Sequence, residues 1–231
     1  GMQIMSMKSL GLLALGSLAL LAMQAQGSEN AEGAKSTENQ HTHSEHSHDH
    51  SYDHDDIYSG YFEDSQVEAR PLSNWEGDWQ SVYPYLQNGT LDPVMVHKAE
   101  HGDKSVQAYL EYYDVGYRTD VDRIVIEGNR VTFHDGNEQI QGQYMADGYE
   151  ILTYEAGNRG VRYIFELTHG DDDAPQFIQF SDHGISPARA DHYHLYWGDD
   201  RKALLDEVVN WPTYYPSALN GEQIAQEMMA H

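Results

Sequence analysis

The feature that most constrains the fold is a change to a two-residue hydrophobic period near residue 122. Apolar and polar residues then alternate in four stretches, which are residues 122–134, 139–167, 175–180 and 192–197. Turn-forming pairs interrupt the pattern at Gly128-Asn129, Asp147-Gly148 and Gly157-Asn158. Short alternating strands separated by polar turns are typical of an antiparallel sheet. We therefore expect a mainly β fold whose sheet is closed, or nearly closed, into a barrel.

Short helices are expected beside this sheet. Asp92-Pro93 has the residue types of a helix start, with Asp92 as N-cap and Pro93 as the first helical residue. Further helical patterns occupy residues 105–116, 201–211 and, after the cap-like Asn220, 221–230. The folded domain is predicted to span residues 67–231, with no internal repeat and no second domain.

The N-terminal residues indicate export. Gly1 precedes the first methionine and is interpreted as a cloning remnant. After Lys8, residues 9–27 (SLGLLALGSLALLAMQAQG) have an apolar core of the length that a signal peptide needs, shorter than a membrane span. We expect residues 1–27 to be a signal peptide cleaved after Gly27, with no membrane insertion afterwards. A single membrane anchor is the alternative.

Residues 28–66 are polar, acidic and rich in histidine, which predicts a disordered tail. Alternating imidazoles and carboxylates offer flexible ligands for zinc, nickel or copper, with modest affinity because binding must order a loose chain. A solvated spacer is the alternative. The tail's candidate metal ligands are His41, His43, His46, His48, His50 and His54.

Charge and cysteine content limit the partners. The formal net charge is −25, and the chain contains no cysteine. This charge argues against nucleic acid and anionic membranes and favours metal cations. Because thiolate ligands are excluded, a metal must be held by nitrogen and oxygen.

Three histidines in the stretch FSDHGISPARADHYHLYWGDD (180–200) are predicted to meet. If residues 186–189 form the turn, with Pro187 at its second position, antiparallel pairing places His183 opposite His192. His194 then lies two residues along, on the same face. Opposed Cβ atoms are about 4.5–5.5 Å apart, and imidazoles at that spacing can reach a common zinc ion. Unmetallated surface histidines are the alternative.

The face that carries these histidines is predicted to be the wetter one. Ile178, Phe180, Tyr193, Leu195 and Trp197 alternate on one face of the hairpin, and the opposite face, with the three histidines, is more polar. Three neutral imidazoles without a metal would make a poor core, because each ring needs one donor and one acceptor satisfied.

Several stretches in order also resemble the ZinT (YodA-like) family of exported metal-binding proteins. They are WEGDWQSVYP, DGYEILTY, GVRYIFE, FIQFSDHGISP, HYHLYWG and NWPTYYP, spread over residues 75–216. The resemblance implies a lipocalin-like (calycin) antiparallel β-barrel with short flanking helices. It implies that the metal-binding histidines are His183, His192 and His194. His134 also matches a family position and is a candidate to contact these ligands without binding the metal itself. The fourth ligand stays open, with water or a His or Glu of the tail as candidates.

The resemblance also implies a role for the protein. It implies periplasmic zinc binding during zinc scarcity, cadmium binding, and cooperation with the solute-binding component of a zinc ABC importer. Zn²⁺ is the expected metal, with Cd²⁺ or another divalent transition metal as an alternative. We expect a monomer without enzymatic activity.

Two other functions remain to be weighed. Three histidines with an open fourth position also describe catalytic zinc, which would make the protein a hydrolase or hydratase. No His-Glu-x-x-His signature is present, and His134 or Glu166 would be the first candidates for a general base. A lipocalin-like binder of an apolar small molecule is suggested by 17 tyrosines and 4 tryptophans, although packing in the core and at the rim of the barrel is the favoured explanation of these aromatics.

Overall fold

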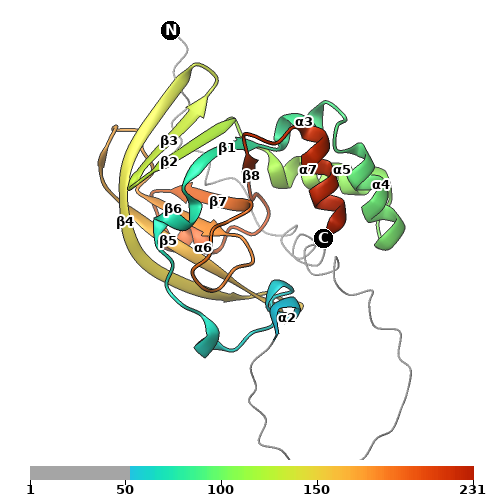
Figure 1. The fold of residues 1–231 in the computed structure, drawn as a ribbon, viewed down its shortest axis with the longest axis horizontal. Coiled ribbons are helices and arrows are strands. Elements are labelled where there is room, and N and C mark those ends of the chain that lie inside the picture. Colours follow the sequence, from blue (N-terminus) through green and yellow to red (C-terminus); the bar gives the residue numbers. More distant parts are fainter. Residues whose placement is uncertain (1–52) are drawn as a thin grey trace, which may run out of the picture.

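The computed structural model describes residues 53–231. Its centre is a closed antiparallel barrel in which eight consecutive strands pair in chain order and β8 returns to β1 (Figure 1). This confirms the predicted mainly β, lipocalin-like fold. The strands are β1 (Gly77–Ser81), β2 (Arg123–Glu127), β3 (Arg130–Asp135), β4 (Glu138–Thr153), β5 (Arg159–Gly170), β6 (Phe177–Ser181), β7 (Tyr193–Gly198) and β8 (Thr213–Pro216).

The helices form two groups in Figure 1: one group lies beside the barrel, and α2 lies below it. The group beside the barrel consists of α3, α4, α5 and α7. The short helix α6 belongs to neither group and directly follows β7. The bounds are α2 (His54–Tyr58), α3 (Tyr83–Gln87), α4 (Asp92–His101), α5 (Val106–Tyr117), α6 (Arg201–Leu205) and α7 (Gly221–Ala230), with 3₁₀ turns η3 (Asp64–Gln66) and η4 (Leu72–Trp75). No helix among residues 53–231 is long and apolar enough to cross a membrane.

Local sequence signals explain most element boundaries. Ser105 caps α5 by accepting from the Ala108 amide, and Asn220 with Gln223 forms a reciprocal capping box at α7. The start of α4 is shifted by one residue from the prediction, because Leu91 is the N-cap and Asp92 is already helical. The predicted helix at 201–211 is shorter than expected and ends at Leu205.

The turns are partly as predicted. Gly128, at φ 60°, lies in the two-residue turn between β2 and β3, and Gly157, at φ 91°, turns β4 into β5. The predicted turn at Asp147-Gly148 is wrong, because β4 continues through it with a register shift between Ala146 and Tyr149. A β-bulge uses the same glycine conformation as a turn, so the residue pair alone does not separate the two.

Two hydrophobic cores meet across β6 and β7. Inside the barrel, rings pack directly on each other, with Trp75 stacked on Phe180 at a centroid distance of 4.5 Å. The aromatics that could have lined a ligand cavity thus fill the barrel. The outer face of the same strands, including Tyr196, packs in a second core with α4, α5 and α7. The histidine face is therefore largely covered by helices, and the prediction of a wet face is wrong.

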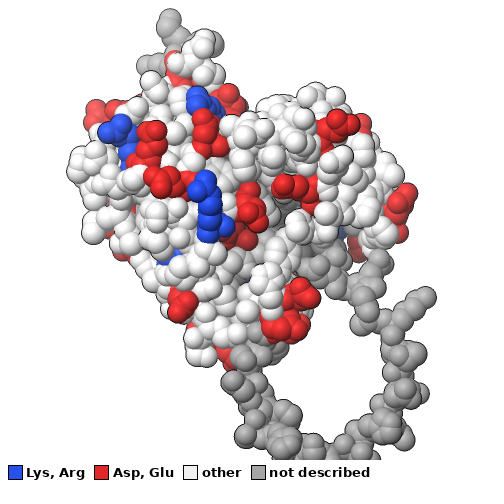
Figure 2. Space-filling model, viewed as in Figure 1, with Lys and Arg blue, Asp and Glu red and all other residues white. Residues whose placement is uncertain are grey.

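The folded part begins earlier than residue 67. Residues 53–66, assigned to the disordered tail by composition, form α2 and η3, and Phe62 is buried in the barrel core. His54 is the first residue of α2, while the other five tail histidines and the expected signal peptide lie outside the described residues. Acidic side chains outnumber basic ones on the face shown in Figure 2.

Candidate metal centre

The fixed point of the site is His194 on β7. Its side chain is buried, and its Nδ1 lies 2.6 Å from the hydroxyl oxygen of Thr213 on β8. Thr213 donates its own hydroxyl proton to the Trp211 carbonyl at 2.9 Å. The threonine oxygen is therefore an acceptor towards His194, so the imidazole carries its proton on Nδ1. The Nε2 lone pair is left free to bind a metal.

The other two rings stand around His194. The centroid of the His183 ring is 6.1 Å from that of His194, and the centroid of His192 is 6.4 Å from it. Both neighbours are nearly perpendicular to His194, at 80° and 82°. Three imidazoles on a tetrahedral zinc ion have centroids about 5 Å apart, so the two separations from His194 are about 1 Å longer than a shared ion requires. The structure thus brings together the trio that the sequence singles out.

The hairpin that carries the trio has the predicted register, but its strands are shorter than predicted. Ser181 pairs with His194, and the remaining pairs of β6 and β7 keep the same register. The two strands end there, so His183 and His192 are loop residues and not an opposed strand pair. His183 has a positive φ of 67°, which turns the chain out of the ladder directly after β6.

Arg70 holds this loop in place. Its guanidinium makes two hydrogen bonds to the Asp182 carboxylate, at 2.6 and 2.8 Å, and a third to the Ala188 carbonyl at 3.0 Å. Both ionised side chains are almost fully buried, so the pair is charge-assisted and shielded from water. The strained conformation at His183 is thus maintained by a clamp on its immediate neighbour.

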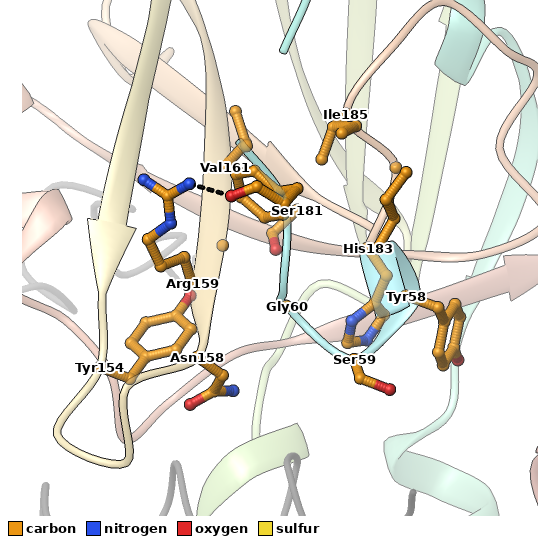
Figure 3. A pocket seen from close by; sticks show the side chains of 14 residues that line it. Tyr58, Ser59, Gly60, Tyr154, Asn158, Arg159, Val161, Ser181, His183 and Ile185 are labelled. Atoms are coloured by element: carbon orange, nitrogen blue, oxygen red, sulfur yellow. Dashed lines mark hydrogen bonds between the residues drawn. The ribbon is translucent and has the colours of Figure 1, made fainter. Parts of the chain in front are cut away.

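Aromatic rings fix the orientation of the two loop histidines. Tyr58 of α2 stacks on His183 at a centroid distance of 4.6 Å (Figure 3). Tyr215 of β8 stacks on His192 at 4.8 Å, with only 9° between the ring planes. Each ligand candidate therefore has a partner that restricts its rotation, as preorganised metal ligands do.

The trio borders a cavity of about 60 Å³ between the barrel and the helices. That volume is enough for an ion with a water molecule. Besides the three histidines, the cavity is lined by Tyr58, Lys98, Tyr113, Tyr117, Trp211, Thr213, Tyr215, Met228 and His231.

Burial keeps the trio neutral. Desolvation lowers the pKa of His192 to about 4, assisted by the nearby His183. Desolvation also lowers the pKa of His183, and it holds the pKa of His194 well below its usual value. Neutral imidazole is the form that binds metal, so the environment favours the ligand-competent state.

The other sequence candidates lie elsewhere. His134 on β3 pairs with Arg123 and Gln139 and is not among the residues that line the cavity, so the supporting role expected for it falls to Thr213. Glu166 on β5 pairs with Met145 and is likewise absent from the lining. Sequence reasoning missed Thr213, Tyr58 and His231, because no local pattern links them to the hairpin.

A closed antiparallel barrel with three imidazoles beside one cavity has the architecture expected of a histidine-based metal-binding barrel. Comparison with known proteins identifies the family. The model of the family described as "ZinT (YodA) periplasmic lipocalin-like zinc-recruitment" matches residues 53–231. The chain belongs to the ZinT family.

Individual relatives are similar over most of the described residues. A probable metal-binding protein, YrpE of Bacillus subtilis, is 65% identical over 176 residues, which are 76% of this chain and 70% of YrpE. The zinc-binding lipoprotein AdcA of Streptococcus pneumoniae is 48% identical over 76% of this chain, but the match spans only 35% of AdcA. The crystal structure of the Zn(II)-bound ZinT-like domain of AdcA superposes with a TM-score of 0.73 at 45% identity, covering 75% of this chain and 97% of the domain.

Proposed function

We propose that the protein binds Zn²⁺ through His183, His192 and His194 and recruits it outside the cytoplasm. The observation that carries this proposal is the bond between His194 and Thr213, which leaves Nε2 of a buried imidazole free beside the other two rings. The family description and the zinc-bound relative support zinc as the metal. Cadmium accepts the same ligands and is a second cargo, because imidazole does not separate the two ions strongly.

The fourth coordination position has a candidate in the structure. His231, directly after α7, lines the cavity, and its charge interacts with both His183 and His192. We propose that His231 or a water molecule completes the coordination. An exchangeable fourth ligand would let the site release its cargo, as recruitment requires.

The histidine-rich tail and the N-terminal apolar segment extend this proposal. Residues 1–27 would export the chain, and the tail histidines would capture zinc weakly and pass it to the trio. The solute-binding component of a zinc ABC importer would be the receiver, with the acidic charge of the chain steering association. Association with such a component should weaken as salt rises, and salt-independent association would contradict the steering.

The test of the proposed site is a zinc-bound crystal structure with anomalous scattering recorded on both sides of the zinc edge. We expect one strong anomalous peak within about 2.0–2.1 Å of a nitrogen of each of the three rings. A fourth density at His231 or at a water would identify the remaining ligand. A strong peak elsewhere, with the trio empty at saturating zinc, would overturn the proposal.

A further inference from the structure

A second cluster of metal-ligating side chains lies on α4. The stretch His97-Lys98-Ala99-Glu100-His101 places two imidazoles four residues apart and a carboxylate between them. Residues separated by three or four positions share one face of a helix. The spacing is a His-x-x-Glu-His order, the reverse of the His-Glu-x-x-His signature, and it can be read from the sequence once the helix is known.

The geometry of this cluster suits a metal ion. One ligand atom from each of the three side chains lies within 4.8 Å of the others. The His97 and His101 rings are 4.4 Å apart between centroids and inclined at 68°. Ligand atoms on tetrahedral zinc are about 3.3 Å apart, so a set that lies within 4.8 Å is close to the spacing that a bound ion requires.

The lysines next to the cluster contact aromatic rings. The Lys98 ammonium lies 5.2 Å from the centre of the Tyr113 ring, on the side of α4 that borders the trio cavity. The Lys104 ammonium lies 5.4 Å from the rings of both Tyr109 and Tyr112. Each lysine thus has an aromatic partner that attracts its ammonium group.

We propose that His97, Glu100 and His101 form a second binding site on α4 for a zinc-class divalent cation. Two imidazoles and one carboxylate are the ligand set that zinc, nickel and copper accept, and a hard ion such as Mg²⁺ disfavours the nitrogens. His97 is partly buried while Glu100 and His101 are exposed, so water occupies the remaining positions and the ion exchanges readily. The site binds more weakly than the buried trio, and it is independent of the trio and of the function proposed for it.

Imidazole resonances of the full-length protein test this site directly. Zinc is titrated into ¹⁵N-histidine-labelled protein, and each ring is followed separately, with assignments from single His→Ala variants. We expect the His97 and His101 resonances to shift together, with a common midpoint at least tenfold below that of His169. His169 is the internal control, because it is an exposed histidine on β5 away from α4.

Two variants separate chelation from independent binding. Chelation predicts that His97→Ala raises the zinc midpoint of His101 to that of His169, and that Glu100→Gln raises the midpoints of both rings at least threefold. Circular dichroism checks that α4 remains folded. The proposal is overturned if His97 and His101 titrate at the midpoint of His169, or if His97→Ala leaves the midpoint of His101 unchanged. The trio resonances report on the proposed function in the same spectra, so failure of either site is seen separately.

Discussion

The Thr213 hydroxyl oxygen accepts a hydrogen bond from Nδ1 of His194 while its own proton is directed to the Trp211 carbonyl. Two strands that are neighbours in the barrel therefore cooperate to fix one imidazole tautomer. A hydroxyl group held in this way orients the ring and keeps Nε2 available as a metal ligand.

Removing that hydroxyl should weaken zinc binding without unfolding the barrel. Thr213→Val keeps the side-chain shape but loses the acceptor, and we expect a loss of about 10–100-fold in zinc affinity, as found when partners of metal-bound histidines are removed. Chelator competition measures the affinity. Thr213→Ser should retain most of it, and Thr132→Val, at another buried threonine, should leave it unchanged. Equal affinity in Thr213→Val and the parent protein would rule out this role.

The clamp between Arg70 and Asp182 should stabilise both the loop and the fold. Arg70→Met leaves the Asp182 carboxylate buried without its cation, which costs about 3–5 kcal/mol of unfolding free energy. The double variant Arg70→Met/Asp182→Asn removes the uncompensated charge and keeps an acceptor for the Gly184 amide, so it should recover part of that loss. Urea unfolding measures both. A loss below 1 kcal/mol in Arg70→Met would show that the pair is not buried in solution.

The metal-free protein should lose stability as the pH falls from about 6.5 to 4. The pKa of His192 is about 4 in the folded state and near 6.5 in the unfolded chain, so in this window the unfolded state binds more protons. Its contribution is therefore complete above pH 6.5 and decreases with acidification. His183 and His194 have lowered pKa values and act in the same direction. Urea unfolding at several pH values should give a shallower slope for His192→Gln, and an identical slope would contradict this origin.

Much of the fold follows from local patterns, whereas the site depends on long-range contacts. The alternation of apolar and polar residues predicts the strands. The two Gly-Asn pairs predict the turns at Gly128 and Gly157, and both glycines have a positive φ in the structure. The same kind of pair misleads at Gly148, because strand neighbours decide between a turn and a bulge. The trio could be predicted because all three residues lie in one hairpin. The stacking of Tyr58 on His183 and the bond from His194 to Thr213 could not, because they depend on where distant segments pack.

The tail should increase the number of zinc ions that the chain binds, but it should not provide the tight zinc site. Deleting residues 28–52 removes five of the six tail histidines and leaves α2 with Tyr58 in place. We expect fewer zinc ions per chain at saturation but one tight site unchanged, since the buried trio is preorganised and the tail is not. Equilibrium dialysis gives the stoichiometry. Loss of the tight site on deletion would place it in the tail.

The most direct test of the central claim is competitive chelator titration of single histidine variants. His183→Ala, His192→Ala and His194→Ala should each weaken the tight zinc site at least a hundredfold, because each removes one of three preorganised ligands. His169→Ala is the matched control and should bind like the parent protein, and circular dichroism confirms that all four variants are folded. Tight binding that survives all three substitutions would show that the metal centre is not at this hairpin.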